Sequence, residues 1–262
     1  MPHFQGPTRV TSSDALERLK ELGPWFYEFD LGESGRREFE LPFEVRPVHE
    51  SRLAMVERVV DEHFRGRLDR VRCLDVGCHE GYYSVAMARK GMREVRGIDV
   101  RQSSLTKARF VAELLGLKNV TYEECNIEDS GRVAPYDLCL CLGLLYHLEN
   151  PVLSLRKISS ITGEVCIIET QVVDEVEGSV EWGARAWTRP YQGILALLDE
   201  SGEFYNHNSE TGASPIAACP SPKALEFMLR QAGFRRTEIV DPPADAYEQH
   251  RRGKRLVCIA YK

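Results

Sequence analysis

The chain has 262 residues, 43% of them hydrophobic, which is enough for a substantial core in one large or two small domains. Its 34 lysines and arginines against 40 aspartates and glutamates leave a net charge of −6. That sign disfavours a protein that captures nucleic acid through its overall charge. Basic residues at positions 235–236 and 251–255 still leave a local basic patch open.

The eight cysteines include no C-x-x-C pair and no His/Cys cluster, so we predict no metal site. Most of them lie in apolar runs, where a buried, reduced thiol acts as a small hydrophobic group. The start of the sequence shows no signal pattern, and no apolar stretch reaches the ~18 residues needed to cross a membrane. We therefore expect a cytoplasmic protein without a membrane segment.

Residues 1–70 form the first part of the chain. Their pattern predicts a short helix over residues 14–22, an aromatic segment, "GPWFYEFDLG", and a second helix over residues 50–64. We interpret them as an N-terminal extension, and the aromatic side chains favour a role as a lid.

From residue 71 to residue 160 the sequence alternates short apolar runs with amphipathic segments, a pattern typical of βαβ units. This rhythm predicts a parallel sheet that is wound on both faces. The expected strands cover residues 71–76, 94–100, 119–125, 136–145 and 163–170. The expected helices cover residues 81–90, a segment capped by Ser103 or Ser104 that ends at Gly116, and residues 152–159.

The pattern changes over residues 171–220, which have scattered aromatic residues and few regular periods. Long loops of this kind are usually functional, so we interpret this segment as an insertion. A helix is expected over residues 222–232, followed by strands over 234–240 and 254–262 that form a terminal hairpin. Residues 71–262 are thus predicted to be one domain interrupted by the insertion.

The first expected strand runs into a glycine loop, "LDVGCHEGYYS", with Asp75, Gly77 and Gly81 in the pattern D-x-G-x-x-x-G. The dinucleotide fingerprint G-x-G-x-x-G has a middle glycine that lets the backbone approach a pyrophosphate, and that glycine is missing here. The Asp75 carboxylate would also repel a phosphate. The loop therefore predicts a nucleoside ligand without phosphates and favours one that carries positive charge.

Asp99 ends the second expected strand, twenty-four positions after Asp75. A carboxylate there is placed to accept hydrogen bonds from both hydroxyls of a ribose. NAD enzymes share such an acid, so Asp99 alone does not identify the ligand. The loop does, because it lacks the glycine that a pyrophosphate needs. S-Adenosylmethionine fits, because it has a ribose and an adenine, no phosphate, and positive charge on its sulfonium and amino groups.

With these motifs, residues 71–170 and the terminal hairpin resemble the class I S-adenosylmethionine-dependent methyltransferases. The resemblance implies an α/β fold, a doubly wound, seven-stranded, Rossmann-like sheet ending in an antiparallel hairpin. It also implies that "CNIE" holds the adenine edge and that the end of the fourth strand borders the methionine tail. The cofactor-binding residues expected on this basis are Asp75, Gly77, Gly81, Asp99, Val100, Asn126, Ile127, Leu142 and Gly143.

A closer resemblance lies in "GLLYHLENP", "VCIIETQVV" and "PSPKALEFMLRQAGF". These segments are similar to the branch that contains the transfer RNA wobble-uridine carboxymethyltransferase, which uses a carboxylated cofactor. The resemblance implies that Tyr146 and Arg255 help bind the added carboxylate. The lysine that completes that clamp has no counterpart here, because Phe26 and Tyr27 follow the tryptophan of "GPWFYEFDL".

We therefore favour methyl transfer to a small hydroxylated or amino-bearing molecule. His147 directly follows the fourth expected strand and is the first candidate for a general base. His207, in "FYNHNSE", is the second. Three alternatives stay open: a tRNA-modifying (carboxy)methyltransferase, a non-catalytic S-adenosylmethionine-binding module, and an NAD-linked oxidoreductase with an atypical loop.

Overall fold

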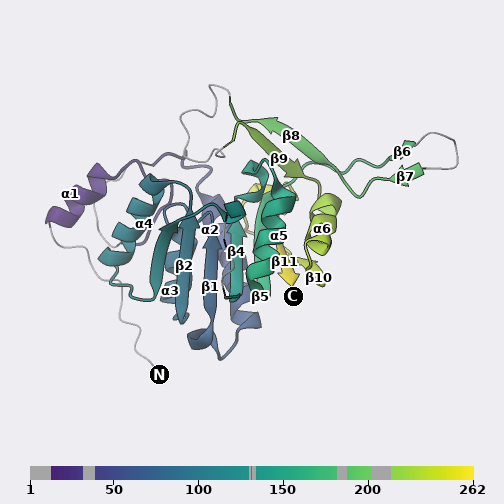
Figure 1. Ribbon diagram of the computed structural model, residues 1–262. Helices are drawn as coiled ribbons and strands as arrows, with labels where there is room; N and C mark the ends of the chain where they lie inside the picture. The colour runs from purple at the N-terminus through teal and green to yellow at the C-terminus, as the bar shows by residue number, and fades with distance from the viewer. Residues whose placement is uncertain (1–12, 32–38, 130, 132–133, 182–187, 202–213) are drawn as a thin grey trace. The chain divides into compact units, whose positions relative to one another are not determined.

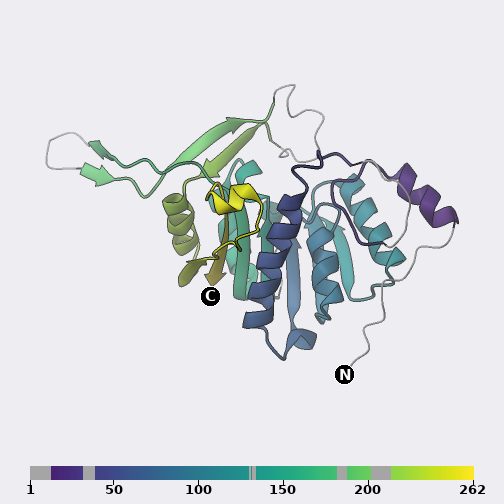
Figure 2. The ribbon, with the colours of Figure 1, turned by 180° about the vertical axis from the view of Figure 1, so that it is seen from behind.

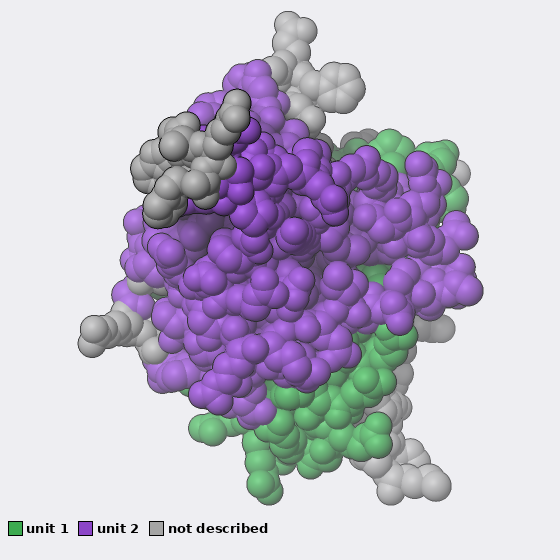
Figure 3. All heavy atoms as spheres, turned by 90° about the vertical axis from the view of Figure 1, so that its right-hand side faces the viewer, with its two compact units in different colours: residues 1–126 green, residues 127–262 purple. Residues whose placement is uncertain are grey.

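The computed structural model describes residues 13–31, 39–129, 131, 134–181, 188–201 and 214–262. The chain divides into two compact units, residues 1–126 and 127–262, which Figure 3 shows in separate colours. The strands are β1 (Arg72–Val76), β2 (Glu94–Asp99), β3 (Val120–Glu124), β4 (Tyr136–Leu142), β5 (Thr162–Gln171), β6 (Ser179–Glu181), β7 (Thr188–Pro190), β8 (Leu195–Asp199), β9 (Ile216–Pro220), β10 (Arg236–Ile239) and β11 (Arg255–Tyr261). The helices are α1 (Ser13–Glu21), α2 (Pro47–His63), α3 (Tyr82–Arg89), α4 (Gln102–Leu114), α5 (Pro151–Ile161), α6 (Pro222–Gln231) and α7 (Glu248–Arg251), with short 3-10 turns η1 (Leu68–Arg70), η2 (Ile127–Asp129) and η3 (Leu145–His147).

Seven strands form one sheet in the order β10-β11-β5-β4-β1-β2-β3 (Figure 1). The strands β1, β2 and β3 follow one another toward one edge of the sheet, and β4 then lies on the other side of β1. This change of direction is expected for a doubly wound sheet. The predicted fold class, an α/β sheet of seven strands, is confirmed. Among the described residues, no helix is long and apolar enough to span a membrane.

In unit 1, β1 pairs with β2 and β2 with β3, all parallel. Strand β1 is buried from its second residue onward, because its apolar run has helices over it. In Figure 2, helices α2 and α3 lie in front of these strands. Helix α4 begins earlier than predicted: Arg101 is its N-cap residue, without a side-chain cap, so Ser103 and Ser104 lie inside the first turn. The backbone N–H of Arg101 donates instead to the Asp99 carboxylate, which fixes the turn.

In unit 2, β4 pairs parallel with β5, while β11 pairs antiparallel with both β5 and β10. The predicted terminal hairpin is therefore confirmed. Strand β4 ends at Leu142 rather than at residue 145, because Gly143 has a positive φ of 73° and the chain then turns into η3. In Figure 1, helix α5 lies in front of the strands of this unit.

The insertion over residues 171–220 is more regular than its sequence suggests. Strands β6 and β7 form one antiparallel hairpin and β8 and β9 a second. In Figure 1 the β8–β9 hairpin lies at the top of unit 2, and the β6–β7 hairpin projects to the right. The aromatic residues Trp182, Trp187, Phe204 and Tyr205 lie outside the described residues, so the lid role of the insertion stays a prediction.

Candidate cofactor and methyl-transfer site

The glycine loop is a tight turn that joins β1 to α3. Gly77, His79 and Gly81 all have positive φ, of 69°, 50° and 79°. The backbone N–H groups of Gly77 and Cys78 both donate to the Ile98 carbonyl, at 2.8 and 3.0 Å. The loop is thereby held against the end of β2, where the ribose acid was predicted.

Gly81 has a steric reason to be glycine as well as a conformational one. A Cβ at this position would collide with the side chain of Tyr122, and the left-handed φ already disfavours any other residue. The ring of Tyr122 thus packs directly under the loop. Gly81 therefore has a structural explanation that is independent of a ligand.

Asp75 lies beneath the loop, 1% exposed. Its Oδ2 atom accepts a hydrogen bond of 2.6 Å from the Ser84 hydroxyl, in the first turn of α3. Burial raises the pKa of Asp75 from 3.8 to about 7, and the Ser84 hydrogen bonds oppose this shift only in part. The carboxyl group therefore stabilises the start of α3 through Ser84. A contact between Asp75 and the cofactor stays a prediction.

Asp99 stands at the carboxyl end of β2 and is held by the backbone on both oxygens. Oδ2 accepts from the N–H of His79 and Oδ1 from the N–H of Arg101, both at 2.9 Å. Each carboxylate oxygen has a further lone pair, so the group retains acceptor capacity for two ribose hydroxyls. This arrangement fits the cofactor, because the carboxylate is fixed before any ligand arrives.

The remaining cofactor candidates of unit 1 follow β2 and β3. Val100 is 42% exposed, and Asn126 is also exposed, just before the unit ends. The N–H of Cys125 donates to the Asp99 carbonyl at 3.0 Å, so the segment that carries Asn126 is attached to the end of β2. Ile127 is buried and begins η2 in unit 2.

A segment of the N-terminal extension, residues 22–29, is bound to the glycine loop; we call it the strap. The Glu80 side chain, 0% exposed, accepts from the N–H groups of Phe26 and Tyr27 at 3.0 and 3.1 Å. The Lys107 ammonium donates to Glu80 at 2.7 Å and to the Pro24 carbonyl at 2.6 Å. The strap is therefore packed structure and not a free edge of the domain.

In unit 2 the end of β4 carries the residues predicted to border the methionine tail. Leu142 is 4% exposed, and the N–H of Gly143 donates to the Glu169 carbonyl at 2.9 Å. The turn η3 follows at once and ends at His147. The base candidate thus lies four residues beyond the glycine that closes the strand.

The His147 imidazole has an acidic partner. Its Nδ1 atom lies 2.6 Å from Oε1 of Glu200, and the two side chains are 12% and 4% exposed. Glu200 directly follows β8, so the insertion supplies it. The second base candidate, His207, lies outside the described residues.

Arg255 and Tyr146, which the resemblance assigned to an added carboxylate, contact each other. Arg255 donates to the Tyr146 hydroxyl and to Glu169, both at 3.2 Å, and to Gln249 at 2.8 Å. His250 Nε2 also lies 3.2 Å from the same Glu169 oxygen. The guanidinium charge is therefore balanced inside unit 2 by a fully buried carboxylate.

Sequence reasoning gave no role to three acidic residues: Glu80, Glu169 and Glu200. For Glu80 a signal existed, since it is a charged residue inside the glycine loop, directly before Gly81. Glu200 had none, because it lies 53 positions from His147 and only the β8–β9 hairpin brings them together. Within the described ranges, no group of three or more His, Cys, Asp or Glu side chains could hold a metal ion.

A family model described as a methyltransferase domain matches residues 68–213, more than half of the chain. The chain therefore belongs to this methyltransferase family, as the glycine loop and Asp99 predicted. It resembles the branch that contains the tRNA U34 carboxymethyltransferases. The enzyme of that name from Haemophilus ducreyi is 26% identical over 243 residues, which are 90% of this chain and 64% of the relative.

A different relative is the ubiquinone biosynthesis O-methyltransferase of Neisseria meningitidis serogroup C. It is 34% identical over 92 residues, 34% of this chain and 39% of that enzyme. The chain therefore spans only part of the length of the curated relatives that it matches.

Solved structures share the fold. The N-terminal domain of EvdMO1, crystallised in the presence of S-adenosylhomocysteine and D-fucose, has a TM-score of 0.64 at 23% identity, over 95% of this chain and 94% of that one. Magnesium protoporphyrin IX methyltransferase of Synechocystis PCC 6803, with bound S-adenosylhomocysteine, has a TM-score of 0.56 at 16% identity, over 86% and 90%. These ligands agree with S-adenosylmethionine as the cofactor.

Proposed function

We propose that the protein transfers the methyl group of S-adenosylmethionine to a small hydroxylated or amino-bearing molecule, with His147 as the general base. The observation that carries this proposal is the place of His147, at the end of the turn η3 that follows β4, with an imidazole that is largely buried and still 12% exposed. A general base must be buried enough for its contacts to orient it and exposed enough for an acceptor to reach it. His147 satisfies both conditions.

The names of similar proteins support a small acceptor. One relative is a ubiquinone biosynthesis O-methyltransferase, and the EvdMO1 domain was crystallised in the presence of a sugar. The net charge of −6 also disfavours an RNA acceptor. A polyanion would need a basic surface to offset this charge.

The chemistry asks little of the protein beyond placement. When bound, S-adenosylmethionine supplies an electrophilic methyl group on a positively charged sulfur. In this proposal Asp99 would hold the ribose, and the glycine loop would hold the nucleoside. Orientation of the acceptor at about 3 Å from the methyl carbon contributes much of the rate. His147 accepts the proton that the acceptor loses.

The test combines a substitution with a screen for labelled methyl transfer. Purified His147→Ala and wild type are each incubated with S-adenosylmethionine labelled in its methyl group, once with a small-molecule extract and once with bulk tRNA. We expect label in the small molecules, and a loss of turnover of about 10²–10⁴-fold in the variant with S-adenosylhomocysteine affinity nearly unchanged. His63→Ala, at the end of α2, serves as a histidine control.

The second candidate is transfer to tRNA from a carboxylated cofactor, which the contact between Tyr146 and Arg255 favours. Glu169 disfavours binding of a carboxylated cofactor, because this carboxylate already balances the charge of Arg255. Label that enters tRNA and not the small molecules would replace the first proposal by the second.

A further inference from the structure

We propose that Glu200 positions His147, and that this His147–Glu200 dyad makes the acceptor group a hydroxyl. The inference rests on the proposed function and narrows its acceptor class. Glu200 comes from the insertion, where no pattern in the sequence marked it as functional. Its carboxylate contacts the imidazole at Nδ1, at 2.6 Å.

That contact decides which nitrogen can act as the base. A carboxylate accepts hydrogen bonds, so the neutral imidazole carries its proton on Nδ1 and keeps the Nε2 lone pair open. Glu200 is 7% exposed, and a carboxylate buried to that extent requires a partner. The pair therefore holds the ring in one tautomer and stabilises the imidazolium that forms when Nε2 takes a proton.

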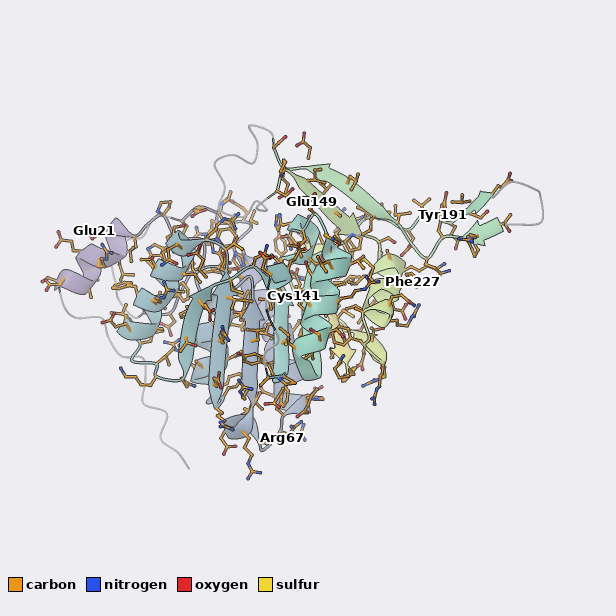
Figure 4. The ribbon with its side chains drawn as sticks, in the orientation of Figure 1. Glu21, Arg67, Cys141, Glu149, Tyr191 and Phe227 are labelled. Atoms are coloured by element: carbon orange, nitrogen blue, oxygen red, sulfur yellow. The ribbon has the colours of Figure 1, made fainter. Side chains whose placement is uncertain are left out.

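The β8–β9 hairpin is attached to the segment that follows His147. The N–H of Ala218, in β9, donates to the Leu148 carbonyl at 3.1 Å. Beside it, the Ser214 hydroxyl donates to Glu149 at 2.6 Å, and Figure 4 labels Glu149 at this place in unit 2. Two anchors next to the dyad thus fix the hairpin relative to η3.

Glu200 itself is held on the same hairpin, and its N–H donates to the Pro215 carbonyl at 2.8 Å. The ring of the neighbouring Tyr146 lies 4.1 Å from the imidazole, between centroids. The Tyr146 hydroxyl in turn accepts from Arg255 at 3.2 Å. The His147 ring is therefore in contact with both the Glu200 carboxylate and the Tyr146 ring, which help to orient it as a base.

The proton balance separates the two acceptor types. With a hydroxyl acceptor, an O–C bond forms as the C–S bond breaks, and the sulfur keeps the electron pair and becomes a neutral thioether. The hydroxyl proton moves to Nε2, and Glu200 offsets the charge of the imidazolium. A neutral amine attacks with its own lone pair and can lose its proton afterwards to water, so it gains little from a dyad.

The first experiment reads the tautomer without any acceptor. The full chain is labelled with ¹⁵N in its histidines, and long-range ¹H–¹⁵N spectra are recorded at a pH where imidazole is neutral. Spectra of His147→Gln assign the His147 signals. Protonated Nδ1 with unprotonated Nε2 supports the dyad, and the opposite tautomer overturns it.

The second experiment measures the function of Glu200. Glu200→Gln removes the charge and keeps the size. Glu226→Gln makes the same change on an exposed side chain of α6, away from the dyad, and is the matched control. The probes are the small-molecule extract and the bulk tRNA of the labelling screen. We expect Glu200→Gln to lower kcat about 10- to 1000-fold without changing the S-adenosylhomocysteine dissociation constant, and Glu226→Gln to stay near wild type.

Each outcome distinguishes the inference from the function beneath it. A Glu200→Gln enzyme with wild-type kcat overturns the dyad and leaves the proposed function intact. Label found on nitrogen in the methylated product overturns the hydroxyl assignment. Label in tRNA alone overturns the small acceptor, and label in neither probe overturns both proposals. Cooperative melting of Glu200→Gln excludes unfolding as the cause of a low rate, and Glu200→Asp, which keeps the charge, should recover part of it.

Discussion

Two aspartates near the glycine loop show how the same side chain takes different roles at neighbouring positions. Asp99 is fixed by two backbone N–H donors at the end of β2 and keeps lone pairs for a ligand. Asp75 is enclosed beneath the loop and contacts Ser84. Burial without a cationic partner makes the ionised form of Asp75 costly, whereas the donors around Asp99 suit a carboxylate.

Asp75 gives a prediction about stability and pH. Its folded pKa of about 7 lies above the unfolded value of 3.8, so the folded protein keeps a proton that the unfolded chain releases as the pH rises between these values. The free energy of unfolding therefore falls with rising pH in this window. Between pH 5 and pH 8 the decline due to Asp75 is about 2–3 kcal/mol. Asp75→Asn removes it, and denaturant melts of both proteins across this range measure the difference. If the free energy of unfolding falls with pH equally steeply in Asp75→Asn and in the wild type, Asp75 does not cause the decline.

At the scale of elements, the strap and the glycine loop depend on each other. The strap has its aromatic side chains buried, with Trp25 0% and Phe26 4% exposed. The Glu80 carboxylate gains its hydrogen bonds largely from the strap backbone. Burial raises the pKa of Glu80 above its ordinary value, although Lys107 opposes this. The N-terminal extension thus stabilises the loop, and its role as a lid over the acceptor stays a prediction.

The strap gives the next prediction. Glu80→Gln replaces a charged acceptor of three donors by an amide, so we expect the free energy of unfolding to fall by about 2–4 kcal/mol. Because the loop carries His79, whose N–H holds Asp99, affinity for S-adenosylhomocysteine should fall as well. Denaturant melts and calorimetric titrations measure the two effects.

The control for this substitution is Glu94→Gln. Glu94 pairs with Arg72 at 2.9 Å in the same unit, but its side chain is 42% exposed. An exposed pair contributes about 0–1 kcal/mol, so this variant should melt close to wild type. Equal losses from both variants would show that the strap contact adds nothing beyond an ordinary ion pair.

For the whole molecule, the predicted site residues are divided between the two units. Unit 1 contains the glycine loop and Asp99, and unit 2 contains the end of β4 and His147. Unit 2 also encloses Arg255, whose charge Glu169 balances. The Arg255–Glu169 pair disfavours a carboxylated cofactor, since the added carboxylate would need a cation whose charge no other carboxylate balances.

A ligand panel tests this selectivity on the full chain. S-Adenosylhomocysteine at about 100 times its dissociation constant adds about 2.7 kcal/mol, which should raise the melting temperature by about 5–10 °C. NAD should cause no rise, because the loop lacks the glycine that a pyrophosphate needs. Titrations should show at most about a tenfold preference for the carboxylated cofactor. A preference of about a thousandfold would restore the tRNA carboxymethyltransferase assignment.

The sequence by itself determined the sheet, because alternating apolar and amphipathic segments specify βαβ units through local burial alone. It also indicated the methyltransferase family, since the glycine loop and Asp99 are short motifs at strand ends. It could not show the β6–β7 and β8–β9 hairpins, where exposed residues obscure the period. Only tertiary structure decided that Glu80 holds the strap and that Glu200 reaches His147. Such contacts join residues 53 or 54 positions apart, and their energy comes from hydrogen bonds to buried carboxylates, which leave no periodic signal along the chain.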